Sequence, residues 1–213
     1  MKKSLQEELG AGRVTIKNAM ENAEIMKTLG KLNYDAKEMN RGWGLLETVY
    51  TLQTEKIGKY GSQFGATQSF YEELEETKAL YKTHRKLAKI ACAGDREKFA
   101  KLQLVKNTNA VEKWLNNASI FYQELLSDSA LIVQFGVTIE ELQQMQAMIQ
   151  ALLDKRNRQI SKKGEAQHAT QKRNAALKAY QEWMKGFRLA ARFAFRDDPQ
   201  LLEILGIMVP TPR

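Results

Sequence analysis

Cysteine is nearly absent from this sequence of 213 residues, and proline occurs only three times. One thiol, Cys92, cannot form an internal disulfide, which excludes the disulfide-stapled scaffolds common among small secreted domains. Pro210 and Pro212 lie in the last few residues, so the body of the chain holds only Pro199. Helices tolerate such a composition, whereas sheets with many tight turns seldom have it. We therefore expect an all-α protein from a reducing compartment.

Long hydrophobic runs are also missing. No stretch approaches the ~18 consecutive apolar residues that a membrane-spanning helix needs. The basic start, residues 1–4, resembles that of a signal peptide, but Leu-Gln-Glu-Glu follows it at residues 5–8 in place of an apolar region. The sequence therefore predicts a cytoplasmic protein without a transmembrane segment.

Histidine is equally scarce. The sequence contains two histidines, so few residues could act as a catalytic base. No Ser-His-acid arrangement can be assembled, and His84 lies on an apolar stripe, where we expect a hydrogen-bonded residue at the edge of the core rather than a base. Cys92 lies between alanines and is expected to be a buried small residue rather than a nucleophile. Glu165 and His168 have the Glu-x-x-His spacing of di-metal bundles, but the matching stretch of the first half offers no ligand. We expect no enzyme, no metal and no cofactor.

What the sequence does contain is an internal repeat. The block Gly-Ser-Gln-Phe-Gly-Ala-Thr-Gln at 61–68 aligns with Gly-Glu-Ala-Gln-His-Ala-Thr-Gln at 164–171, 103 residues later. This block lies at a break between helical segments, where the spacing of apolar residues in a helix does not require these residue types. Its recurrence therefore indicates a duplication. We predict two tandem copies, residues 1–104 and 105–207, packed as one domain, with a tail at 208–213. Residues 1–103 and residues 104–213 each carry a net charge of +4.

Each copy is predicted to begin with one helix and to end with a short one. The first helices cover residues 14–29 and 110–126. The closing helices follow Asp95 and the Asp-Asp-Pro sequence at 197–199, where aspartate is a suitable N-cap and proline a suitable first residue. A one-residue slip of the repeat aligns Asp95 with Asp197.

Between them lies a long helical region in each copy. Asp35 and Thr138 stand where an N-cap is expected, each with a glutamate three residues later, which is the capping-box spacing. Apolar residues then recur at steps of four and three on both sides of Gly61 and Gly164. Each side has about 26 residues, or roughly 39 Å of helix.

Two architectures fit these arms, the helical segments of equal length on the two sides of Gly61 and of Gly164. One is an antiparallel hairpin with its tip near Gly61 and Gly164, and the other is a continuous helix of nearly 60 residues in each copy. We favour the hairpin because Gly58, Gly61 and Gly65 lie close together, and glycine costs ~1 kcal/mol relative to alanine inside a helix. The predicted fold is thus an elongated helical bundle of two helix-plus-hairpin copies.

Apolar side chains outside these arms are expected to be buried. The run 130–135, Ala-Leu-Ile-Val-Gln-Phe, should pack the two copies together, with a partner subunit as the alternative. We also expect four aromatic residues near the end of the chain to pack in the core and around the closing helix: Trp183, Phe187, Phe193 and Phe195.

Charge is the other departure from an ordinary composition. Residues 155–196 hold twelve Lys and Arg against two Glu, a net of +10, whereas the matching stretch 52–93 has a net of +2. Clustered cations on a helix can neutralise phosphates. The candidate polyanion-binding residues are Lys155, Arg156, Arg158, Lys162, Lys163, Lys172 and Arg173.

These observations favour a non-catalytic structural or protein-interaction module, with a protein partner or self-association. The alternative is binding of a polyanion, either nucleic acid or an anionic membrane surface, through the basic hairpin at 155–196. An enzyme ranks third.

Overall fold

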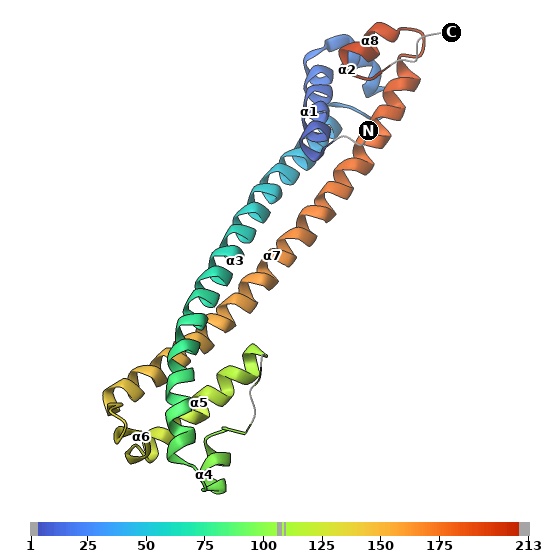
Figure 1. The fold of residues 1–213 in the computed structure, drawn as a ribbon. Helices are drawn as coiled ribbons and strands as arrows, with labels where there is room; N and C mark the ends of the chain where they lie inside the picture. The colour runs from blue at the N-terminus through green and yellow to red at the C-terminus, as the bar shows by residue number, and fades with distance from the viewer. Residues whose placement is uncertain (1–3, 106–107, 109, 209–213) are drawn as a thin grey trace. The chain divides into compact units, whose positions relative to one another are not determined.

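A computed structural model describes residues 4–105, 108 and 110–208 of the chain. The described residues form helices and no strand, so the all-α prediction is confirmed. In chain order the helices are α1 (Leu5–Glu21), α2 (Ala23–Gly30), α3 (Ala36–Ala91), α4 (Arg96–Lys101), α5 (Val111–Ser127), α6 (Ala130–Val133), α7 (Ile139–Ala194) and α8 (Pro199–Ile204) (Figure 1).

These helices form two series of matched lengths. α1 to α4 have 17, 8, 56 and 6 residues, and α5 to α8 have 17, 4, 56 and 6. α7 lies 103 residues after α3, and α8 lies 103 residues after α4. The predicted one-residue slip is wrong, because the N-cap of α8 is Asp198 and not Asp197. A common origin of the two series remains a prediction.

The hairpins predicted at Gly61 and Gly164 are wrong. α3 continues through Gly61 and α7 through Gly164 as uninterrupted helices. Chain reversals use glycine with positive φ, and the described glycines of that kind follow helix ends, at Gly94, Gly136 and Gly206. Packing on both sides of the glycines offsets the ~1 kcal/mol that each costs inside a helix.

The first helices also differ from the prediction. The helix expected at 14–29 is two helices, because the Asn22 side chain caps α2 by accepting from the backbone N–H groups of Glu24 and Ile25 at 3.0 and 3.1 Å. α1 begins earlier, at Leu5, after a capping box. In the second series, α5 matches the predicted 110–126 to within one residue at each end.

Both predicted N-caps of the long helices are confirmed. The backbone N–H of Glu38 donates to Asp35 Oδ1 at 2.9 Å, and that of Glu141 donates to Thr138 Oγ1 at 3.1 Å. Each bond satisfies one of the free amide groups at a helix start. The glutamate side chains, however, contact residues of the opposite long helix, as described below.

The described residues of 1–59 and 166–213 form one compact unit, which we call unit 1. It contains α1, α2, the first part of α3, the last part of α7, and α8. Within this unit the two long helices run in opposite directions (Figure 1). Its buried residues include Leu9, Ile16, Ile25, Leu29, Met39, Leu46, Tyr180, Phe187, Phe195 and Leu205.

The described residues of 60–165 form the other compact unit, unit 2. It contains the last part of α3, then α4, α5, α6 and the first part of α7. Polar pairs show that α3 and α7 are antiparallel here too, because the partner number falls as the α3 number rises: Thr67 with Gln159, Glu73 with Lys155, and His84 with Glu141. The buried residues include Phe70, Leu74, Tyr81, Trp114, Phe121, Tyr122, Ile132, Leu142 and Ile149. Each unit therefore combines elements of both predicted copies.

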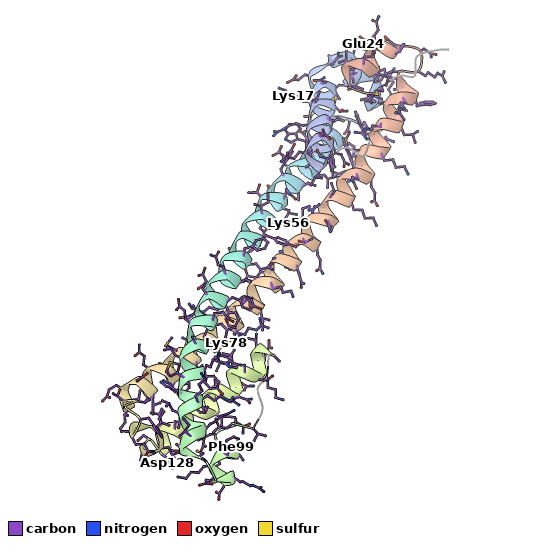
Figure 2. All side chains as sticks on the ribbon, viewed as in Figure 1. Lys17, Glu24, Lys56, Lys78, Phe99 and Asp128 are labelled. Carbon is purple, nitrogen blue, oxygen red and sulfur yellow. The ribbon has the colours of Figure 1, made fainter. Side chains whose placement is uncertain are left out.

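Side chains of α3 and α5 meet closely in unit 2. The Lys78 ammonium lies 5.9 Å from the centre of the Trp114 ring, and Tyr81 packs edge-on against the same ring, with the two ring centres 5.4 Å apart. Figure 2 labels Lys78 on α3. At the end of α5, the Asp128 carboxylate pairs with Lys98 at 2.7 Å, which ties α4 to α5. These contacts hold the first helix of one series against the long helix of the other.

Most of the predicted burial is confirmed, and two parts are wrong. Trp183, Phe187 and Phe195 are buried, but Phe193 is 63% exposed because it lies about 240° around the helix from Phe187. The run 130–135 buries only Ile132 completely, since a one-turn helix has one inner face, and both Val133 and Phe135 are exposed. Of the predicted tail, residues 209–213 lie outside the described residues.

Cys92 is buried, as predicted from its small neighbours, with 1% of its surface exposed. Burial raises the pKa of its thiol, and the carboxylates of Asp95 and Asp128 act in the same direction. The thiolate that a nucleophile needs is therefore disfavoured.

Replacement of the mid-helix glycines tests their conformation. Apart from the adjacent residues and the backbone of the same helix turn, no atom lies within 4 Å of a Cβ placed at Gly61 or Gly164. Gly61→Ala and Gly164→Ala should therefore each stabilise the protein by roughly 0.5–1 kcal/mol. Urea unfolding measures this change. Gly136→Ala is the control and should be destabilising, because Gly136 has a φ of +85°. Loss of stability in the first two variants would contradict the continuous helices.

Candidate interaction surface

The seven candidate polyanion-binding residues all lie on α7, but they belong to different units. Those from Lys155 to Lys163 are in unit 2, whereas Lys172 and Arg173 are in unit 1. The structure therefore does not bring them together within one compact unit.

Three of these residues are already paired with glutamates of unit 2. The pairs are Lys155 with Glu73 at 2.5 Å, Arg156 with Glu112, and Lys162 with Glu165 at 2.9 Å. The Arg156 guanidinium also lies over the Phe70 ring, 5.7 Å from its centre, and holds the pKa of the Glu112 carboxyl below its usual value. Three of the five candidate cations between Lys155 and Lys163 therefore form ion pairs within unit 2.

The remaining four candidates differ in exposure. Arg158, Lys163 and Lys172 are exposed, and among the described residues they form no ion pair. Arg173 is half-buried, and its Nε has no hydrogen-bond partner in the described part of the chain. Their role as polyanion contacts stays a prediction.

The later section of the basic stretch lines a groove in unit 1. A cavity of about 370 Å³ lies between α7 and the first turn of α1. Three cations from successive turns of α7 line it, namely Lys185, Arg188 and Arg192. Their spacing of three and four residues places them on one face of the helix. From α1 comes Glu8, whose carboxylate accepts a hydrogen bond from Gln181 at 2.8 Å. We call this site the α7 groove.

Apolar side chains accompany these cations. Met184 and Leu189 line the same groove, and Leu189 is 72% exposed. One turn further along α7 is the exposed Phe193, with the Arg196 guanidinium 5.7 Å from the centre of its ring. Arg196 itself pairs with Asp197 at 3.2 Å, whereas the three cations that line the groove have no ion pair among the described residues. The exposed leucine and phenylalanine beside these three cations form a surface that is both apolar and positive.

Tyr180 closes the groove toward α1. Its ring is buried, and a Cβ placed at Gly12 would lie 1.6 Å from the phenol oxygen, so only glycine allows this close approach. Burial raises the pKa of Tyr180 to about 12, which keeps the phenol neutral. The hydroxyl has no hydrogen-bond partner among the described residues.

The other notable polar clusters lie between the long helices. In unit 2, His84 is buried, with Nδ1 3.0 Å from the Tyr122 hydroxyl and Nε2 2.9 Å from Glu141 Oε1. Because a carboxylate only accepts, we assign the ring proton to Nε2, so that Tyr122 donates to Nδ1. His84 is thus a hydrogen-bonded core residue, as its place on an apolar stripe indicated.

Unit 1 has a corresponding arrangement at Glu38, which lies 103 residues before Glu141. The Glu38 carboxylate accepts from Trp183 Nε1 at 2.8 Å and from the Arg41 guanidinium at 2.6 Å. The hydrogen bond from Arg41, followed by that from Trp183, holds the pKa of Glu38 below its usual value. In both units a glutamate of the first helical turn fastens one long helix to the other.

Sequence reasoning counted the cations of the α7 groove but did not single them out. A signal was present, because Lys185, Arg188 and Arg192 repeat the spacing of Lys82, Arg85 and Lys89 exactly one repeat length earlier. Glu8 gave no signal, since only the fold brings α1 beside the end of α7.

Comparisons with protein-family models, with curated proteins and with solved structures found no match. Within the described residues, no group of three or more His, Cys, Asp or Glu side chains could hold a metal ion. No helix of that part of the chain has the length and apolar character needed to cross a membrane.

The cluster around His84 should contribute to stability. Replacing His84 with alanine leaves a buried cavity and removes the partner of the Tyr122 hydroxyl, so it should cost about 2–4 kcal/mol of unfolding free energy. The exposed His168→Ala is the matched control and should change stability by less than about 0.5 kcal/mol. Urea unfolding distinguishes the two, and equal effects would contradict this role of His84.

Glu38 should make stability depend on pH. A carboxyl group whose pKa is lowered by folding stabilises the protein above its unfolded pKa and loses that contribution as the pH falls through the folded pKa. Glu38→Gln should therefore lower the unfolding free energy at neutral pH and flatten its decline in acid. Denaturant unfolding at neutral and acidic pH measures both effects, with the exposed Glu203→Gln as control. An unchanged acid decline would contradict the prediction.

Proposed function

We propose that this protein is a non-catalytic interaction module that binds another protein through the α7 groove of unit 1. One observation carries the proposal, namely that three cations and an exposed leucine share a groove along one helix face. The clusters around Glu38 and His84, by contrast, are satisfied within the units.

The energetics of this surface favour a protein partner. Burial of a leucine or phenylalanine side chain contributes roughly 1.5–3 kcal/mol, and Leu189 and Phe193 are both mostly exposed. Lys185, Arg188 and Arg192 have no ion pair among the described residues. A partner that covers the apolar side chains and supplies carboxylates would gain from both.

The residues that could perform catalysis support a non-catalytic function. Cys92 and His84 are buried, and the imidazole of His84 already has a partner on each ring nitrogen. Neither group is placed to meet a substrate. The matched lengths of the two helix series also support a module built from tandem copies, which is common among interaction proteins.

Polyanion binding is the second candidate. Arg158, Lys163 and Lys172 are exposed on α7, which favours it. The glutamates that pair with Lys155, Arg156 and Lys162 weaken it, because they reduce the net positive charge of that section.

Site-specific photo-crosslinking tests the proposed function. Benzoylphenylalanine placed at Leu189, in cells that naturally contain the protein, should crosslink one protein species. The same group at Ile57, an equally apolar and exposed position of unit 1, should not. Arg188→Glu and Arg192→Glu, introduced together, should abolish the crosslink at 189. Equal capture at both positions, or capture of nucleic acid alone, would contradict the proposal.

A further inference from the structure

We infer that the α7 groove binds an acidic amphipathic helix, one that carries carboxylates and leucine-like side chains along one face. This inference rests on the proposed function and specifies the chemistry of the partner. It follows from the spacing of the cations, from the apolar residues between them, and from the carboxylate of Glu8.

The cations have the spacing of a helix surface. Lys185, Arg188 and Arg192 are separated by three and four residues, which corresponds to ~4.5 and ~6 Å along the axis. Carboxylates at the same intervals on a partner helix would face all three at once. Along α7 the groove extends from Tyr180 to Arg192, a rise of ~18 Å, so about three turns of a partner fill its length.

Apolar residues indicate what lies between those carboxylates. The buried Met184 and the exposed Leu189 line the groove together with the cations. Leu189 lies between Arg188 and Arg192, and Phe193 continues the apolar edge by one turn. An apolar side chain on the partner, between two acidic positions, would cover Leu189. A ligand made only of charged groups would leave this surface in water.

Glu8 argues against a phosphate-rich ligand. Its carboxylate lines the groove and is held there by Gln181. It would repel a nucleic-acid backbone or an anionic lipid headgroup, both of which carry densely spaced negative charge. A peptide can avoid this repulsion by placing a neutral or basic residue opposite Glu8. The concave shape also fits a rod better than a flat membrane surface.

Unit 2 supplies an internal comparison with the same charges. Lys82, Arg85 and Lys89 lie 103 residues before the three groove cations. There, however, Arg85 is buried and donates to the Leu104 carbonyl at 2.9 Å, and the position equivalent to Leu189 is Lys86. Unit 2 thus has the charge pattern with a lysine in place of the exposed leucine, while Ile90, equivalent to Phe193, is also exposed. Changes there provide a charge-matched control.

Binding of designed peptides tests the inference. The probe is a fluorescein-labelled acidic helix of about three turns, with leucines four residues apart and glutamates at steps of three and four. Fluorescence anisotropy would compare it with a scrambled peptide of equal composition, with single-stranded DNA, and with phosphatidylserine vesicles. We expect the wild-type protein to bind the designed helix at least about tenfold more tightly than each of the others.

Variants locate the site. Arg188→Gln with Arg192→Gln, and separately Leu189→Gln, should each weaken binding of the designed helix by about tenfold. Lys82→Gln with Lys89→Gln removes the same charge from unit 2 and should change binding by less than roughly twofold. Circular dichroism and urea unfolding would show that each variant is folded, as expected for changes at exposed or half-buried positions.

Several outcomes would overturn the inference. Equal binding of the scrambled peptide would show that net charge alone causes binding, and tighter binding of DNA or vesicles would show that the groove prefers a phosphate ligand. An equal loss of binding in the unit 2 control would show that the peptide does not bind specifically at the α7 groove. No binding of the designed helix would show that the groove does not recognise an acidic amphipathic helix. A crosslinked protein at Leu189 would then still support the proposed function, so the two can fail separately.

Discussion

The structure depends on a buried seam along α3, which is continuous for 56 residues, as α7 is. Residues of α3 spaced by seven, from Met39 to Ala88, form this seam. All of them are buried or half-buried, so the phase does not change across the glycine-rich section. Leu46 before Gly61 and Leu74 after it belong to the same series and are both fully buried. Because the seam is buried at each end of the helix, a glycine between those ends weakens α3 without breaking it.

Polar groups at the starts of the long helices complement this seam. Glu38 and Glu141 occupy equivalent positions, and each accepts a hydrogen bond from a ring nitrogen on the opposite long helix. Their partners, Trp183 and His84, are not themselves equivalent, so the two units reach the same result with different residues. Since a buried polar group without a partner is costly, such pairs favour one register of the helices. The polar atoms of Glu38, Trp183 and His84 thus have hydrogen-bond partners within their own units.

The two units show how similar charge patterns can give different surfaces. Lys185, Arg188 and Arg192 line a groove with Leu189, whereas the equivalent Arg85 is buried against a backbone carbonyl. The difference arises from the neighbouring helices and from single replacements rather than from the spacing of the cations. The spacing of the cations alone therefore does not determine the surface that surrounds them.

The sequence by itself determined the features that depend on nearby residues. These include the all-α class, the N-caps at Asp35 and Thr138, the closing helices, and the burial of His84 and Cys92. Caps and apolar periodicity act within a few residues, so they are visible in one stretch of sequence. Only the tertiary structure decided the rest: the continuity at the glycines, the glutamates that pair with Lys155 and Arg156, and the groove beside Glu8. Each of these depends on packing or charge partners contributed by segments far apart in the chain.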